Sequence, residues 1–155
     1  MDNLQTKRKI LFVDDMRQNI DVLRDIFSDY VRMVALNGEH ALKIAASRNP
    51  PDLILLDIMM PDIDGFEVCR RLKADEQTKH IPVIFVTAKK EASDEALGLS
   101  LGAVDYIIKP FNVDVIRQRV KVHLAQKDLL DGLKEQIQQL NARLFSLNPV
   151  CSAPS

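Results

Sequence analysis

The stretch LILLDIMMPDIDG, residues 53–65, is the part of the sequence that decides the predicted fold. Its four apolar residues, 53–56, are typical of a strand buried on both faces of a parallel sheet. Asp57 comes directly after them, and Pro61 and Gly65 delimit a loop before a helical pattern begins. Ligands of open α/β sheets bind at the carboxyl ends of the strands. Asp57 is therefore the first candidate for chemistry, although an aspartate in this place could equally cap a helix or a turn.

The composition predicts an ordinary cytoplasmic domain. The chain has 155 residues, of which 46% are hydrophobic and 28% charged, with a net charge of −1. This charge balance gives no electrostatic reason to expect nucleic acid or a membrane as a direct partner. The N-terminal sequence MDNLQTKRK lacks the apolar region of a signal peptide, and all apolar runs are far too short for a membrane span. Two cysteines do not make a disulfide framework.

Strand and helix patterns alternate five times along the chain. Strands are expected at residues 9–13, 31–35, 52–56, 83–87 and 104–108. Helices are expected over about residues 17–28, around 41–45, over 65–74 and 92–101, and from 113 onward. This alternation predicts a doubly wound α/β fold with a parallel sheet covered on both faces, completed within about the first 125 residues.

Local signals give finer expectations. Asn37-Gly38 is a turn signal, and Gly102 suits the end of a helix. For the fifth helix, Asn112 is the expected N-cap, and the expected inward residues are Val113, Ile116, Val120 and Leu124. The three histidines, His40, His80 and His123, are interpreted as surface residues without a catalytic part.

Chemically active side chains lie at the ends of four of the five predicted strands. They are Asp14 and Asp15 after the first strand, Asp57 after the third, Thr87 at the end of the fourth and Lys109 after the fifth. In a parallel sheet these ends share one edge, and two carboxylates about 4 Å apart repel by roughly 4 kcal/mol at an effective dielectric of 20. Such a cluster needs a cation or a proton. Oxygen ligands alone suit Mg²⁺, and no histidine or cysteine near the cluster suggests zinc.

This set of groups favours phosphoryl transfer. An aspartate can attack phosphorus to form an acyl phosphate, and a metal with a lysine can meet the charge on the transferred oxygens. A threonine could donate a hydrogen bond to a third oxygen. A lone threonine or lysine at a strand end usually has an ordinary structural role, so the prediction depends on all five residues occurring together in consistent order.

Four motifs resemble those of bacterial response-regulator receiver domains. They are FVDD at 12–15, LLDIMMPDIDG at 55–65, FVTA at 85–88 and DYIIKPF at 105–111. The resemblance covers about residues 8–125. It implies a flavodoxin-like, five-stranded sheet with strand order 2-1-3-4-5.

The resemblance also assigns roles to individual residues. It implies that a sensor histidine kinase or a phosphotransfer protein phosphorylates Asp57, within a regulatory rather than an enzymatic domain. Asp14, Asp15, Asp57 and the main-chain carbonyl of Met59 would bind Mg²⁺. Thr87 and Lys109 would contact the phosphoryl group, and the Lys109-Pro110 bond would be cis. Thr87 and Tyr106 would form the switch, although Tyr106 could also be simply a half-buried tyrosine of an edge strand.

Two other classes stay in view. A metal-dependent hydrolase with an aspartyl intermediate is disfavoured because no cap domain is present, and because Asp14-Asp15 lacks the D-x-D spacing of haloacid-dehalogenase-type phosphatases. A dinucleotide-binding enzyme is disfavoured because no G-x-G-x-x-G comes after the first strand.

Beyond the sheet the sequence carries a heptad pattern. Its apolar residues, spaced 3, 4, 3, 4 and 3 apart, are Leu130, Leu133, Ile137, Leu140, Leu144 and Leu147. This seam predicts a coiled-coil helix at residues 126–148 and a parallel homodimer, which an outer row of Val115, Val122 and Leu129 would extend. The alternative is a single helix folded back on its own domain.

The region after the predicted coil gives two expectations. Residues 149–155 are predicted to be a disordered tail. Receivers that resemble this one often continue into an enzymatic output domain, such as a cyclic-dinucleotide synthase, a phosphodiesterase or a kinase. We therefore expect the chain to be the regulatory part of a longer protein.

Overall fold

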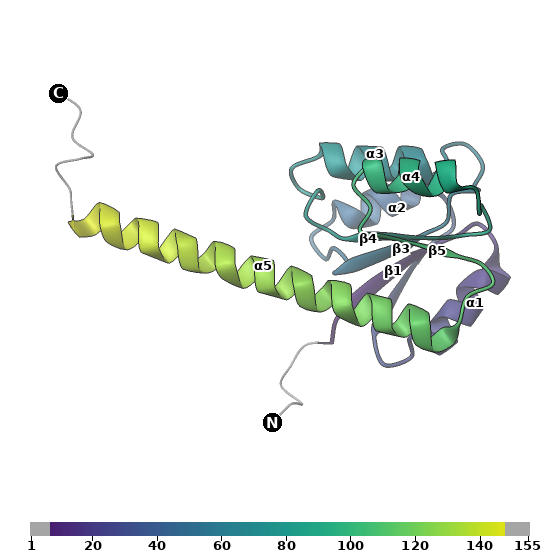
Figure 1. The fold of residues 1–155 in the computed structure, drawn as a ribbon, viewed down its shortest axis with the longest axis horizontal. Helices are drawn as coiled ribbons and strands as arrows, with labels where there is room; N and C mark the ends of the chain where they lie inside the picture. The colour runs from purple at the N-terminus through teal and green to yellow at the C-terminus, as the bar shows by residue number, and fades with distance from the viewer. Residues whose placement is uncertain (1–6, 148–155) are drawn as a thin grey trace.

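The computed structural model describes residues 7–147 and contains one parallel sheet with five helices (Figure 1). The strands are β1 (Lys9–Val13), β2 (Val31–Ala35), β3 (Leu53–Leu56), β4 (Val83–Thr87) and β5 (Asp105–Ile108). The helices are α1 (Arg17–Ile26), α2 (Gly38–Ala45), α3 (Gly65–Ala74), α4 (Ala92–Ser100) and α5 (Val113–Leu147). The strand order is β2-β1-β3-β4-β5, so the predicted doubly wound fold and its strand order are confirmed.

The sheet separates two hydrophobic cores. In Figure 1, α2, α3 and α4 cover one face, and α1 and α5 cover the other. Successive residues of β3 point to opposite faces, so that Ile54 and Leu56 belong to one core and Leu53 and Leu55 to the other. All four are at most 1% exposed, because both faces of this central strand are covered. β2, at one edge of the sheet, is partly exposed.

Several predicted boundaries move by a few residues. α1 ends at Ile26 rather than at residue 28, because the chain turns at Phe27, whose N–H still donates to the Leu23 carbonyl. Asn37 does not form a free turn: its side chain accepts a hydrogen bond from the His40 N–H at 2.8 Å and caps α2. Gly102 lies after α4 with a φ of 108°, as a glycine at a helix end allows.

α5 is one continuous helix of 35 residues. Its N-cap is Asn112, whose side chain accepts from the Val115 N–H at 3.1 Å, and Ile116, Val120 and Leu124 are buried as predicted. The prediction for Val113 was wrong, since this residue is 48% exposed. It is the first residue of the helix and borders a surface pocket beside α1 instead of the sheet.

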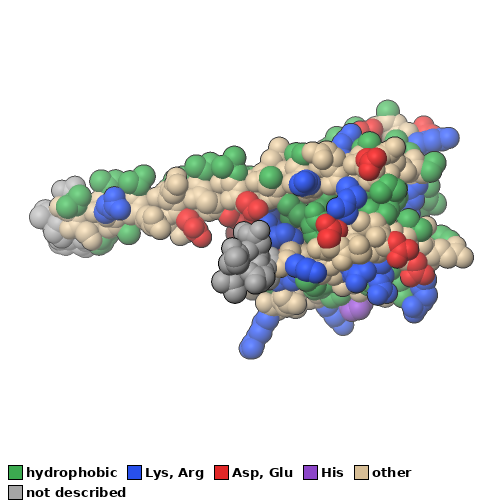
Figure 2. Space-filling model, turned by 90° about the horizontal axis from the view of Figure 1, so that it is seen from below, with side chains coloured by type: hydrophobic (Ala, Val, Ile, Leu, Met, Phe, Trp, Pro, Cys, Tyr) green, Lys and Arg blue, Asp and Glu red, His purple; other side chains and the backbone are tan. Residues whose placement is uncertain are grey.

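The second half of α5 projects away from the domain (Figure 1), which excludes the alternative of a helix folded back on the sheet. Near the point where α5 leaves the domain, Arg8 Nη1 contacts both carboxylate oxygens of Asp128, at 2.7 and 2.6 Å. The side chains of the heptad seam are 47–73% exposed, and Figure 2 shows hydrophobic side chains along the projecting helix. The C-terminal residues of the predicted coil and tail, from 148 onward, lie outside the described residues.

Within residues 7–147, no helix combines the length and the apolar character that crossing a bilayer would require.

Candidate functional site

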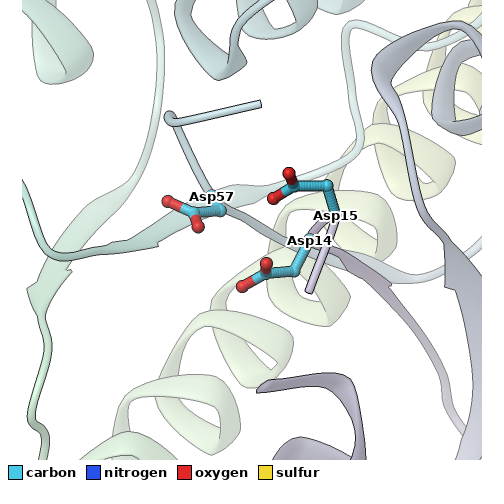
Figure 3. A group of neighbouring side chains, drawn as sticks. All are labelled: Asp14, Asp15 and Asp57. Atoms are coloured by element: carbon cyan, nitrogen blue, oxygen red, sulfur yellow. The ribbon is translucent and has the colours of Figure 1, made fainter. Parts of the chain in front are cut away.

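The strand ends bring the predicted site residues together at one edge of the sheet. Sheet pairing continues one residue beyond the strands: the Asp57 N–H donates to the Val13 carbonyl at 2.9 Å, and the Lys109 N–H donates to the Thr87 carbonyl at 2.8 Å. Asp14, Asp15 and Asp57 therefore lie side by side (Figure 3), with one carboxylate oxygen of each within 4.8 Å of the others. The predicted convergence of Asp14, Asp15, Asp57 and Lys109 is confirmed.

Asp14 is the most deeply buried of the three acids, at 2% exposure. Its Oδ1 accepts a hydrogen bond from the Met16 N–H at 2.9 Å. Its Oδ2 accepts from the Asn19 amide at 3.0 Å and forms an ion pair with Lys109 Nζ at 2.9 Å. A buried carboxylate needs such partners, because an unpaired charge is costly to remove from water.

Asp57 is buried but less well compensated. Its Oδ2 lies 3.4 Å from Lys109 Nζ, so the lysine is closer to Asp14, and its Oδ1 accepts from the Met59 N–H at 3.3 Å. Burial raises the pKa of Asp57, and the charge of Asp14 adds to this effect, while Lys109, the hydroxyl of Thr87 and the Met59 N–H oppose it. The ionised form is therefore short of positive charge, which is the condition that favours a bound cation.

The acids fit a hard divalent cation. Asp15 is exposed where Asp14 and Asp57 are buried, so the cluster opens toward solvent on one side. An open pocket of ≈ 370 Å³ lies there, lined by Asp15, Ile58, Met59, Met60, Pro61, Asp64 and Lys89. Carboxylate oxygens on one side and water on the other suit an ion that keeps part of its hydration shell.

Thr87 and Tyr106 connect the site to the neighbouring edge of the sheet. Thr87 is fully buried, and its hydroxyl oxygen accepts a hydrogen bond from the Lys89 N–H at 3.3 Å. The Tyr106 hydroxyl donates to the Lys89 carbonyl at 2.6 Å. Burial, together with nearby acidic charges, raises the pKa of Tyr106 to about 12. At 6% exposure Tyr106 is buried rather than half-buried, because it packs in the core beneath α4.

The loop after β3 is shaped by close backbone contacts. The Gly65 N–H donates to the Ile58 carbonyl at 2.9 Å, and a Cβ on Gly65 would overlap the carbonyl oxygen of Asp57. Asp62 adopts a φ of 70°, in the left-handed region, and Asp64 caps α3 by accepting from the Glu67 N–H at 2.9 Å. The Lys109-Pro110 peptide bond is cis, as predicted.

Sequence reasoning missed two residues. Asn19 contacts Asp14, and its only signal is a polar residue of modest helix propensity in the first turn of α1. His123 is not a free surface residue, because its Nε2 lies 3.0 Å from the Asp105 carboxylate, which Arg119 also contacts at 2.7 Å. His40 and His80 are exposed, as predicted. The partner of His123 is Asp105 on β5, and the sequence around residue 123 contains no pattern that indicates this contact.

The fold and the acidic pocket together are those of a phospho-accepting regulatory domain of two-component signalling. The chain matches the family model of the response regulator receiver domain over residues 10–121. It belongs to that family.

Relatives and solved structures agree with this assignment. The chain is 43% identical over 137 residues to a "Probable cyclic di-GMP phosphodiesterase" of Vibrio cholerae, covering 88% of this chain and 31% of that protein. It is 41% identical over 130 residues to the response regulator PleD of Caulobacter vibrioides, covering 83% and 28%. The chain thus spans less than a third of the length of these two relatives.

Among solved structures, a receiver domain protein of Methanospirillum hungatei matches with a TM-score of 0.72 at 26% identity, covering 79% of this chain and 98% of that one. A two-component response regulator from Clostridium difficile matches with a TM-score of 0.69 at 29% identity, covering 77% and 97%.

Proposed function

We propose that Asp57 is the residue of this receiver domain that accepts the phosphoryl group. The supporting observation is its position, buried beside Lys109 and Asp14 yet next to the open pocket at the strand ends. An oxygen of Asp57 attacks the phosphorus of a phosphohistidine on a kinase or phosphotransfer protein. The P–N bond breaks, the imidazole leaves with the bonding electrons, and an acyl phosphate forms on Asp57.

The neighbouring groups have separate roles in this proposal. Lys109 stands between Asp14 and Asp57, so its ammonium group can meet the negative charge of the incoming phosphoryl oxygens. The Thr87 hydroxyl would donate a hydrogen bond to another of these oxygens. Asp14, Asp15, Asp57 and the main-chain carbonyl of Met59 would hold Mg²⁺. When bound, the ion neutralises charge on the acids and on the phosphoryl group.

A donor protein has an apolar surface available beside this site. A pocket of ≈ 460 Å³ lies between α1 and the β5–α5 loop, lined by residues that include Val22, Ile26, Phe111 and Val113. Lys109 also lines it, so a partner seated there would lie next to the phosphorylation site. This proximity supports a phosphohistidine-bearing protein as the phosphoryl donor.

Intact-mass spectrometry with acetyl phosphate tests the site directly. We expect one labile phosphoryl group on the wild type when Mg²⁺ is present, and none when a chelator is added. Asp57→Asn should abolish the label, because an amide does not form the acyl phosphate. Asp52→Asn, at the opposite end of β3, is the matched control and should label normally. Equal labelling of Asp57→Asn would show that another residue accepts the phosphoryl group.

We further propose that residues 126–148 form a parallel two-stranded coiled coil. Six exposed seam residues support the coil, since each buried side chain of this size contributes up to about 1.5–3 kcal/mol before entropy costs. Val115, Val122 and Leu129, which are 40–66% exposed, would continue that surface toward the receiver. The coil would relay the state of Thr87 and Tyr106 to an output domain, which the Vibrio cholerae relative suggests to be enzymatic.

Light scattering at micromolar concentration tests the dimer. The wild type should have the mass of a dimer, and Leu133→Asp combined with Leu140→Asp should give a monomer, because two charges would enter the seam. Gln138→Asp with Gln139→Asp adds the same charge on the outer side of the heptad and should leave the dimer intact. A wild type that is monomeric would refute the coil.

A further inference from the structure

Asn19 is a side chain at the site whose contact neither the motifs nor the proposed chemistry accounts for. It lies in the first turn of α1, a place where asparagine is a weaker helix former than alanine. Its amide donates to Asp14 Oδ2 at 3.0 Å, the same oxygen that Lys109 Nζ contacts at 2.9 Å. Asn19 is half-buried and also borders the apolar pocket beside Lys109.

The Asn19 contact occupies one of the hydrogen-bond acceptor positions of the Asp14 carboxylate. A carboxylate offers about four acceptor positions, two on each oxygen. On Asp14, Oδ2 accepts from both Asn19 and Lys109, while Oδ1 accepts from the Met16 N–H at 2.9 Å. Three of the four positions are therefore occupied, and the remaining one is on Oδ1. Without the Asn19 amide, a second position would open on Oδ2, and both oxygens could face a cation.

We propose that Asn19 is a positioning residue that makes Asp14 present a single oxygen to the bound cation. This inference rests on the proposed function, because it assumes that the acid cluster holds a divalent ion. A single fixed oxygen suits Mg²⁺, which requires near-octahedral geometry and keeps several waters. Two free oxygens suit Ca²⁺, which accepts bidentate carboxylates and more ligands. Asn19 therefore sets the preference of the site for the smaller ion.

Calorimetric titration of the unphosphorylated protein with Mg²⁺ and with Ca²⁺ tests the proposal without any phosphoryl transfer. In Asn19→Ala we expect the Kd for Mg²⁺ to rise roughly tenfold, the size of effect usual for residues that orient metal ligands. The Kd for Ca²⁺ should change much less, so the preference of the site for Mg²⁺ over Ca²⁺ should decrease. Asn19→Leu, which keeps the approximate shape of the side chain, should behave in the same way.

Gln18→Ala is the matched control, since Gln18 is exposed on the same turn of α1 and should bind both ions as the wild type does. A role of Asn19 in α1 alone would change the thermal unfolding midpoint while leaving both dissociation constants unchanged, and that result would overturn the proposal. An equal loss of affinity for both ions would also overturn it. Failure of the proposed function is a different result, namely that the wild type binds neither ion or that Asp57 takes no label.

Discussion

The substitution Asp57→Asn should stabilise the cation-free protein. The Asp57 side chain is only 9% exposed, and its closest cation, Lys109, is shared with Asp14 and nearer to it. The burial that raises the pKa of Asp57 means that its ionised form weakens the fold at neutral pH. Asparagine keeps the shape and removes the charge. We expect the unfolding free energy to rise by an amount on the order of 1 kcal/mol, the usual size of the effect of a single substitution.

The stability difference between the wild type and Asp57→Asn should depend on pH. A carboxyl group with a raised folded-state pKa favours the folded state while it is protonated, below its unfolded pKa near 3.9. That contribution is lost as the pH rises through the folded-state pKa of Asp57. Wild type and variant should therefore have similar stability near pH 4 and diverge toward pH 7. Urea unfolding at both values measures the difference.

Mg²⁺ should reduce the difference in unfolding free energy between Asp57→Asn and the wild type. The variant lacks one of the carboxylates that would bind the ion, so Mg²⁺ should stabilise it less. At ten times the Kd, a ligand of the folded state adds about 1.4 kcal/mol, which is roughly 3–6 °C in melting temperature for a chain of this size. Asp29→Asn is the matched control of opposite sign. The Arg117 guanidinium lowers the pKa of Asp29, so this variant should lose stability at pH 7 and little at low pH. A less stable Asp57→Asn at pH 7 without cation would refute the reasoning.

Two further predictions concern the backbone at single positions. Gly65→Ala should lower the unfolding free energy by about 2–4 kcal/mol, since its Cβ would overlap the preceding strand end, whereas Gly132→Ala, with open space around it in α5, should raise it by about 0.5–1 kcal/mol. Asp62→Gly should preserve or raise stability and Asp62→Val should lower it by about 1–2 kcal/mol, because a φ of 70° suits glycine and not a β-branched residue. Thermal and urea unfolding of each pair would measure both differences.

The sequence predicted the sheet and the position of the site for the same physical reason. Strands buried on both faces, such as β3, must be apolar throughout, so their ends are marked by the first polar residue. Asp57 after β3, the Asp14–Asp15 pair after β1 and Lys109 after β5 are such residues. Parallel pairing then places them at one edge, and no tertiary information is needed to infer their convergence.

Contacts between elements were less predictable. The closer pairing of Lys109 with Asp14 rather than Asp57 depends on side-chain reach across the sheet edge, which strand order alone does not determine. The His123–Asp105 contact joins α5 to β5 across 18 positions of sequence, and no periodicity encodes it. Val113 fits the inward spacing of α5, but the helix begins beyond the edge of the core at that residue. Propensity and spacing describe single elements, while these contacts depend on how two elements meet.

The described contacts join the proposed phosphorylation site to α5 along the β4–β5 edge of the sheet. The Thr87 hydroxyl acts on Asp57 and accepts from the Lys89 N–H, and the carbonyl of Lys89 accepts from the Tyr106 hydroxyl. Tyr106 comes after Asp105 in β5, and the Asp105 carboxylate binds Arg119 and His123 of α5. Each step is a hydrogen bond, an ion pair or a covalent neighbour.

A second connection exists through the central strands, but it is of a different kind. β1 and β3 carry site aspartates at their carboxyl ends, while Arg8 and Asp52 at their other ends contact each other at 3.4 Å, and Arg8 binds Asp128 of α5. Both strands are buried and paired on each side, and a close-packed core resists small displacements. This connection joins α5 to the sheet at Asp128. The Lys89 loop is partly exposed and β5 is an edge strand, so we expect both to shift more easily than β1 and β3 after a change at Asp57. We expect phosphorylation to act on α5 through its contact with Asp105 while the Arg8 end stays in place.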